Sequence, residues 1–299
     1  MKVVLLALAS TLAGVTLSSA QGAPPPKTYL GGSPRVSPDG AHILFGSNRS
    51  GTGQIYVMKA DGSDLRQLTH VATGAHGGQW SPDGRRIVFE TSDSSGMVGR
   101  ILIMNADGTS PRVVDEARGN QAPSWSHDGS KILFASGTFP NINIYTMNLY
   151  GTDRRNISPN PGFDYDPVWS PDGKQIAFVV GTRGEGVRVN VMNADGTGRR
   201  RVSADAVNEE RPTWSRDGKL LAYQASTRGQ TPTRAYVYVA DLSTGTTRRV
   251  TNPEGAQLDE TPSWFPDGKR LAIQSDRDGT WSVYVIDLNG TTLARLTMP

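Results

Sequence analysis

Cysteine is absent from this chain of 299 residues, which excludes disulfides and thiolate metal sites. Beyond the N-terminus, no apolar run reaches the 18 or more residues that a membrane helix needs, so stable membrane insertion is not expected. The sequence also lacks the Gly-x-Ser-x-Gly, His-Glu-x-x-His and Walker patterns of common hydrolases and nucleotide enzymes. These absences favour a non-catalytic protein whose stability comes from packing.

The first 20 residues have the pattern of a secretory signal peptide. Lys2 precedes an apolar run from Val3 to about Val15, and small residues at Ser18 and Ala20 mark a cleavage site. We expect cleavage after Ala20, followed by a proline-rich linker over residues 21–32 and one domain over 33–299. No cysteine follows the cleavage site to carry a lipid, so the expected location is the periplasm or the exterior.

The charge of the mature chain is nearly balanced. Without Lys2, 30 basic residues face 28 acidic ones, a net charge of about +2. This balance gives no indication of nucleic-acid binding.

A repeated unit fills the rest of the chain. The tetrapeptide Ser-Pro-Asp-Gly at 37–40 returns with small changes at 81, 126, 170, 215 and 265, which places its aspartate at intervals of 44, 45, 44, 45 and 50 residues. These aspartates are Asp39, Asp83, Asp128, Asp172, Asp217 and Asp267. Repeats of this length are typical of propellers, solenoids and arrays.

Each repeat is predicted to contain four short strands. A stretch ending in tryptophan leads into the Asp-Gly turn, and an alternating apolar run such as HILFGS at 42 or KILFAS at 131 follows. A third strand such as IYVM at 55 and a last strand ending QLT, NIS or RVT complete the unit. No segment shows a sustained helical period. Six such units predict an all-β, six-bladed β-propeller with four antiparallel strands in each blade.

These residues carry a family resemblance. The repeat resembles the PD40 (WD40-like) repeat of TolB-like six-bladed propellers, over residues 33–297, without a counterpart of the TolB N-terminal domain. The resemblance implies binding of a protein or peptide partner at the face and channel of the ring, a role in protein transport, and divalent ions such as Ca²⁺ in the channel. Closure by packing between blades, with a strand at 28–30 adding to the last blade, is expected, as is a monomer.

The aspartates of the Asp-Gly turns are predicted to be structural. Aspartate accepts hydrogen bonds from amides two residues further on, and glycine tolerates a positive φ. The tryptophans at 80, 125, 169, 214 and 264, with Val36 in the first unit, are interpreted as spacers between blades. Because the inner strand runs from one face to the other, Asp172 should lie far from Asp164 and Asp166.

The segments that cross from one blade to the next supply the predicted binding residues. Five residues before a tryptophan stand Asn120, Asp164, Glu209 and Asp259, with Ala75 and then His76 in the second unit. Asp166, Glu210 and Glu260 add charge nearby. We expect these residues to form a one-sided acidic rim for a cationic peptide segment or an ion. The alternative is that they cap amides of their own loops.

Two further alternatives remain open. Arginines recur on the last strands, at positions 66, 112, 155, 200, 249 and 295; they are interpreted as protection of exposed sheet edges, or as sites for an anionic polysaccharide. An enzyme similar to oligogalacturonate lyase, which uses a metal and histidine at the channel, is the alternative function. Among the histidines at 42, 70, 76 and 127, only His70 and His76 fall in a crossing between blades.

Overall fold

The computed structural model describes residues 31–93, 98–160, 162–182, 186–202, 208–227, 233–252 and 257–297. The predicted signal peptide, the strand expected at 28–30 and all of the linker except Gly31 and Gly32 lie outside these residues. The described part of the chain contains no helix, and so none that could cross a bilayer.

Twenty-four strands follow one another along the described residues, and successive groups of four form units numbered here as blades 1 to 6. Blades 1 and 2 contain β1 (Gly32–Val36), β2 (His42–Ser47), β3 (Gln54–Lys59), β4 (Arg66–Gln67), β5 (Ala75–Trp80), β6 (Arg86–Ser92), β7 (Val98–Asn105) and β8 (Arg112–Asp115). Blades 3 and 4 contain β9 (Asn120–Trp125), β10 (Lys131–Thr138), β11 (Asn141–Asn148), β12 (Arg155–Asn156), β13 (Phe163–Trp169), β14 (Gln175–Thr182), β15 (Gly186–Asn193) and β16 (Arg200–Arg201). Blades 5 and 6 contain β17 (Glu209–Trp214), β18 (Leu220–Ser226), β19 (Ala235–Asp241), β20 (Thr246–Arg249), β21 (Asp259–Trp264), β22 (Arg270–Ser275), β23 (Ser282–Asp287) and β24 (Thr292–Arg295).

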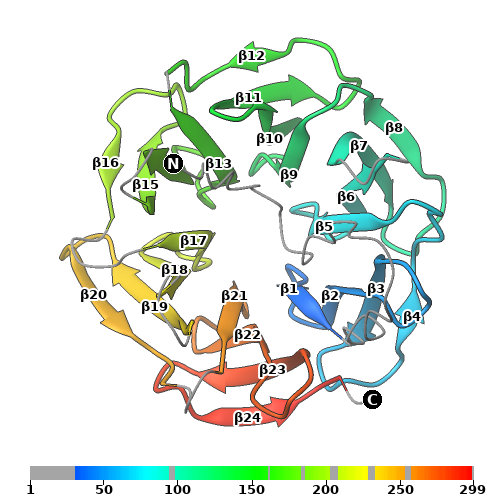
Figure 1. Ribbon diagram of the computed structural model, residues 1–299, viewed down its shortest axis with the longest axis vertical. Helices are drawn as coiled ribbons and strands as arrows, with labels where there is room; N and C mark the ends of the chain where they lie inside the picture. Colours follow the sequence, from blue (N-terminus) through cyan, green and yellow to red (C-terminus); the bar gives the residue numbers. More distant parts are fainter. Residues whose placement is uncertain are drawn as a thin grey trace, which may run out of the picture.

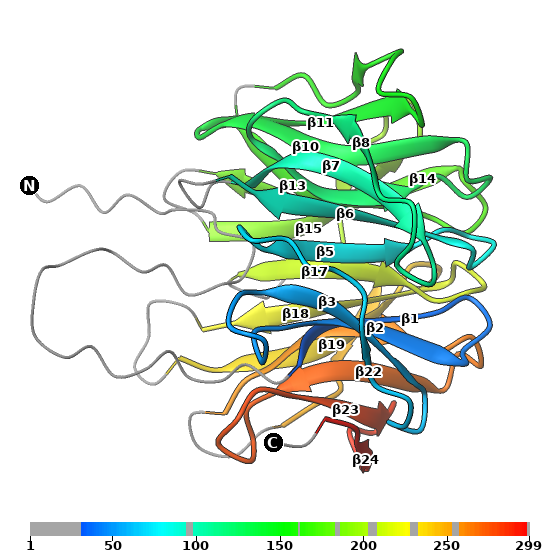
Figure 2. The same ribbon diagram turned by 90° about the vertical axis from the view of Figure 1, so that its right-hand side faces the viewer.

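The blades stand around a central channel, as in a propeller (Figure 1). The first strand of each blade lines the channel and the fourth lies on the perimeter. In the side view the strands run between the two faces of the ring (Figure 2). The Asp-Gly turns define one face, called the turn face. The hairpins between second and third strands, such as residues 48–53, define the other, called the loop face. The prediction of an all-β propeller is confirmed.

Blades 1, 2, 5 and 6 are separate four-stranded sheets, whereas the strands of blades 3 and 4 are assigned to one eight-stranded sheet. The join is a single parallel pair, Ile142 with Phe163. The same kind of parallel contact occurs as isolated pairs at Val187 with Asn208 and at Ala235 with Leu258. The join is therefore the same kind of single-pair contact that is found at two other junctions.

The hydrophobic core lies between neighbouring blades. The second and third strands are buried on both faces, and the aromatic rings of Phe89, Phe134 and Phe178 are at most 1% exposed. One cluster joins Phe45 of blade 1 to Phe265 and Val283 of blade 6. Burial of these side chains closes the ring, since about 25 cal/mol is gained per Å² of apolar surface removed from water.

The seam between blades 6 and 1 is close-packed. The amide of Gly31 donates to the main-chain oxygen of Trp281 at 3.2 Å. A Cβ at Gly31 would lie 3.0 Å from the side chains of Thr297 and Val283, tighter than ordinary contact. Among the described residues, β1 pairs with β2 and no strand of blade 1 pairs with a strand of blade 6. The described residues thus show side-chain packing and one main-chain hydrogen bond at this seam, and the expected strand at 28–30 lies outside them.

The turn aspartates are structural, as predicted. In the first turn, Asp39 accepts hydrogen bonds from the Ser37 hydroxyl at 2.5 Å and the Ala41 amide at 2.9 Å. The same serine and amide donors hold Asp83, Asp128, Asp172 and Asp217. These bonds lower the pKa of each of these carboxyls. Asp172 follows the end of β13 that is opposite to Asp164.

The tryptophans join successive blades, which supports their interpretation as spacers. The indole N–H of Trp80 donates to the oxygen of Arg35, and that of Trp125 donates to the oxygen of Gln79, at 3.0 and 3.1 Å. Trp214 and Trp264 make the corresponding bonds to blades 4 and 5. The Trp169 indole nitrogen is buried and has no hydrogen-bond partner among the described residues.

The Ser or Thr that ends the last-strand motif caps the third strand. Thr251 accepts the amide of Val237 at 3.0 Å, and both groups are buried. Equivalent bonds reach Thr69, Ser158 and Thr297 from Ile55, Ile144 and Val283. The arginine row lies on the outermost strands and is exposed, apart from the half-buried Arg295. This placement is consistent with edge protection and does not test polysaccharide binding.

Candidate ligand-binding channel

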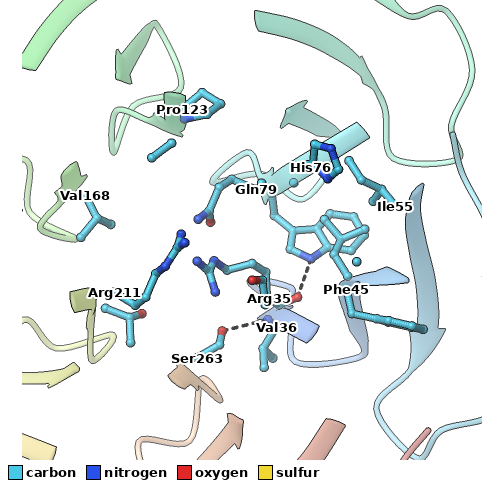
Figure 3. Close-up of a pocket in the computed structure, with 18 of the residues that line it drawn as sticks. Arg35, Val36, Phe45, Ile55, His76, Gln79, Pro123, Val168, Arg211 and Ser263 are labelled. Carbon is cyan, nitrogen blue, oxygen red and sulfur yellow. Dashed lines mark hydrogen bonds between the residues drawn. The ribbon is translucent and has the colours of Figure 1, made fainter. Parts of the chain in front are cut away.

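The central channel encloses a cavity of about 400 Å³, within the range of small-ligand sites. Its walls come from the first strands of the blades and from the gap between blades 1 and 2. In Figure 3 the side chains of Arg35, Arg211 and Gln79 point toward the middle of the cavity, with Val168 and Ser263 on other sides. Charged, polar and apolar groups therefore meet in one space.

A bulge in every first strand shapes the channel wall. The residue three positions before the tryptophan, or before Val36, has a positive φ, between 48° and 64°. The pairing of the first and second strands shifts register around this point in every blade. The residues concerned are Ser33, Gly77, Ala122, Asp166, Arg211 and Thr261. Five of them are not glycine, so the conformation is costly and is held by its surroundings.

Hydrogen bonds from the preceding blade hold three of these bulges. The Ala122 amide donates to Oε2 of Glu90 at 2.7 Å. The Thr261 amide donates to Oε1 of Gln224 at 3.0 Å, and the Ser33 amide donates to Oε1 of Gln274 at 2.8 Å. A buried amide without a partner is costly, so these Glu and Gln side chains stabilise the wall.

Further hydrogen bonds extend this network around half of the channel, from blade 4 to blade 1. Tyr165 donates to Glu210 at 3.0 Å, and Gln224 donates to the same carboxylate at 3.2 Å. Gln274 donates in the same way to Glu260 at 3.2 Å, and the Thr261 hydroxyl donates to Gln274 at 3.4 Å. This network fixes the wall on that side.

Charge in the channel is concentrated around Arg211. Its Nε lies 3.4 Å from Oδ2 of Asp166, and both side chains are largely buried. Burial acts to lower the pKa of Arg211, but the carboxylates of Asp166, Glu210 and Glu90 outweigh it and raise that pKa. Arg211 is therefore a permanent, partly shielded cation in the wall.

The predicted acidic rim is not a solvent-facing feature. Asp164, Glu209, Asp259 and Asn120 are at most 1% exposed. Asp164 forms an ion pair with Arg199, and Nη2 of Arg277 lies 2.7 Å from Oδ1 of Asp259. Burial raises the pKa of the Asp164 carboxyl against the opposing effect of Arg199.

The other two residues of this set are also held within the protein. Glu209 accepts the amide of Val189 at 2.9 Å, and Asn120 accepts a bond from Arg154 at 3.4 Å. The expectation of an exposed rim at these four positions is wrong, because their side chains are packed inside the ring. The Glu209 contact is with an amide of β15 in the preceding blade, and not with an amide of its own loop, as the alternative expected.

The remaining predicted residues lie closer to the cavity. Asp166 and His76 line it, whereas Glu210 and Glu260 are half-buried members of the hydrogen-bonded wall. Burial lowers the pKa of His76, so its imidazole is neutral at pH 7. The structure therefore brings Asp166 and His76 to one cavity and leaves the other six beside it or away from it.

The described residues contain no group of three or more His, Asp or Glu side chains placed to hold a metal ion. The acidic crossings, which were expected to bind a cationic segment or an ion, direct the carboxylates of Asp164, Glu209 and Asp259 to separate partners. Of the four histidines, His76 alone lines the cavity among the described residues.

Arg35, Arg211 and Glu90 were not among the residues predicted from the sequence. The signal was in the repeat itself: Arg35 and Gln79 immediately precede Val36 and Trp80, and Arg211 stands three residues before Trp214. A comparison of the units at these positions, rather than at the fifth residue before tryptophan, would have found them.

Comparisons with known proteins agree with this architecture. The sequence profile described as TolB beta propeller domain (PD40) matches residues 25–119 and 110–235, more than half of the chain. The chain therefore belongs to the TolB-like PD40 β-propeller family. A "Protein TolB homolog" of Chlorobium luteolum is 34% identical over 145 residues, a stretch covering 48% of this chain and 33% of that protein. The match thus spans about a third of that relative's length.

Solved structures share the fold. TolB from Acinetobacter baumannii superposes with a TM-score of 0.70 at 20% identity, over 89% of this chain and 61% of the other. An oligogalacturonate lyase in complex with manganese gives a TM-score of 0.61 at 20% identity, over 90% of this chain and 77% of the other. At such identities the likeness shows the architecture alone.

Proposed function

We propose that this chain is an exported, non-catalytic binding protein, a six-bladed propeller that receives a segment of a partner protein in its central channel. The observation that supports this most is the channel itself: a cavity of about 400 Å³ in which Arg35, Arg211 and Gln79 converge between apolar walls. Such a mixture of fixed polar groups and apolar surface is typical of a recognition site.

A non-catalytic role is supported by the chemistry of the wall. His76 is the single histidine lining the cavity among the described residues, and no hydrogen bond orients its ring there. A general base normally lies within hydrogen-bond reach of a nucleophile and of an orienting group. The lyase alternative is supported only by a shared fold.

A plug in the channel tests the proposal. Val168→Trp places an indole in the cavity, and Thr246→Trp adds the same side chain on the exposed perimeter strand β20. Both chains, tagged and compared with the wild type, would be used to capture proteins from an envelope extract. We expect one protein to be retained by the wild type and Thr246→Trp and lost with Val168→Trp. Retention of the same proteins by all three would refute channel binding.

Export has its own test. N-terminal sequencing of the chain recovered from the periplasm or medium should begin at Gln21, because cleavage is expected after Ala20. Recovery only from the cytosol, with Met1 or Lys2 at the terminus, would contradict export without bearing on the channel.

A further inference from the structure

Two guanidinium groups share the channel. Arg35 belongs to β1 and Arg211 belongs to β17. In Figure 3 both side chains point into the same cavity, with the Gln79 amide beside them. Arg35 donates a bond to the oxygen of its neighbour Pro34 at 2.8 Å, which orients its guanidinium. The two cations therefore come from strands 176 residues apart and are directed at one space.

The lining has more positive than negative groups. Among the described residues, three arginines (Arg35, Arg211 and Arg216) and two acids (Glu90 and Asp166) line the cavity. Glu90 accepts the Ala122 amide, and Asp166 contacts Arg211. Asp166 and Arg211 stand at the same position of their units, three residues before the tryptophan, and Arg35 immediately precedes Val36.

The mouth on the turn face has a charged residue where the repeat has proline. Arg216 occupies the position of Pro38, Pro82, Pro171 and Pro266 in other units. Its guanidinium lies 3.4 Å from the oxygen of Pro38 in blade 1, so it reaches across the mouth from blade 5. Positive charge thus extends from the mouth to Arg35.

Asp166, Glu210 and Glu90 already favour the charged form of Arg211, and the cavity lining still has three arginines against two acids, so an added anion is attracted to it. A carboxylate suits this position, because guanidinium groups donate parallel bonds to its two oxygens. We infer that the channel binds a carboxylate of a partner peptide, with Arg35 and Arg211 as the recognising cations and the Gln79 amide as a further donor. This inference deepens the proposed function and rests on it.

The size of the cavity favours a peptide segment. A volume of about 400 Å³ is at the low end for small-ligand sites, so a chain end or one acidic side chain fits and a folded domain does not. Pro123 and Val168 add apolar surface on the blade 3 and blade 4 sides of the same cavity. The carboxylate could belong to a C-terminus or to Glu or Asp, and the experiment separates these two sources.

Three labelled probe peptides with the sequence Ala-Pro-X-X-Pro-Ala provide the test by fluorescence polarisation with the full chain. The first has X = Glu and an amidated C-terminus, the second X = Gln with the same amide, and the third X = Gln with a free C-terminus. Binding of the first probe would show that the channel recognises a side-chain carboxylate. Binding of the third would show that it recognises a C-terminal carboxylate. We expect at least tenfold weaker binding of the uncharged probe.

Arg35→Gln should lower the affinity for the bound charged probe by at least tenfold, because the Arg35 guanidinium contacts the carboxylate. Arg200→Gln, on the perimeter strand β16, is the matched control and should leave the affinity unchanged. A melting curve of each variant checks that the fold persists. Arg35→Lys keeps the charge without the paired donors and should bind with intermediate affinity.

Equal affinity for all three probes, no affinity for any, or an unchanged affinity in Arg35→Gln would overturn the inference. These results are separate from the plug experiment. If Val168→Trp abolishes capture of a partner while Arg35→Gln retains it, channel binding stands and carboxylate recognition does not. If the plug has no effect, the proposed function itself fails.

Discussion

The Tyr165 hydroxyl donates a hydrogen bond to Oε1 of Glu210, 3.0 Å away, and so joins blade 4 to blade 5 at the channel wall. Burial, and then the Glu210 carboxylate, raise the pKa of Tyr165, so the phenol stays protonated and remains a donor at neutral pH. A bond from a neutral donor to a charged acceptor contributes about 1.5–3 kcal/mol to stability.

Tyr165→Phe should therefore lower the free energy of unfolding by about 1.5–3 kcal/mol, measured by urea denaturation. Tyr236→Phe, at a half-buried ring that lies against Arg249 on the perimeter, is the control and should change stability by less than about 0.5 kcal/mol. Equal effects of the two substitutions would show that the bond between the blades adds nothing.

The tryptophans offer a matched pair. Trp214 donates its indole N–H to the oxygen of Val168 at 3.2 Å, whereas the Trp169 indole nitrogen is buried without a partner among the described residues. Trp214→Phe should cost about 1 kcal/mol more than Trp169→Phe, because only the first removes a hydrogen bond. Thermal unfolding of both variants measures the difference. A larger loss for Trp169→Phe would contradict this interpretation.

The capping threonine makes a separate prediction. Thr251→Val keeps the shape of the side chain but leaves the buried amide of Val237 without its 3.0 Å acceptor. We expect a loss of about 1–3 kcal/mol in denaturant titrations. Thr247→Val on the perimeter strand β20 is the control, since a valine there remains in a strand without uncovering a buried donor. If both variants unfold at the same denaturant concentration, the cap has no role.

The turn aspartates predict a dependence of stability on acidity. The Ser126 hydroxyl and the Ser130 amide lower the pKa of Asp128 to about 2, from 3.8. A depressed folded pKa means that the stabilisation is present above pH 3.8 and is lost as the pH falls toward 2. Because Asp128 is mostly exposed, solvent screening limits the effect to about 0.5–1 kcal/mol.

Asp128→Asn should thus be less stable than the wild type at pH 6 by about 0.5–1 kcal/mol, and the difference should vanish between pH 4 and pH 2. Glu116→Gln, at an exposed side chain, serves as the control. Denaturant titrations across this pH range give the answer. A difference that grows on acidification would reverse the sign of the argument.

The repeat in the sequence was sufficient to predict the propeller. Strand order, the Asp-Gly turns and the spacing role of tryptophan all follow from local chemistry that recurs about every 45 residues. These features depend on residues that are close together within one repeat. The same pattern can therefore be checked in each of the other repeats.

The binding residues were harder to predict, because they depend on which side of the first strand each side chain faces. The bulge at Asp166 and its equivalents inserts an extra residue, which breaks the alternation between the two sides. Asp164 therefore turns into the protein, toward Arg199. The partners of Glu90 and Arg211 belong to other blades, and no pattern within one unit reveals them.

The close approach of Gly31, Trp281 and Thr297 at the seam means that the chain can be circularly permuted. Gly31 and Thr297 both approach Val283, so a short linker from residue 297 to residue 31 could connect them without disturbing the packing. A circularly permuted gene that starts at blade 3 and finishes with blade 2 would then keep the contacts within and between blades. We expect the permuted protein to fold and to have a melting temperature close to that of the parent. The stability of the ring would then not depend on which blade contains the chain ends.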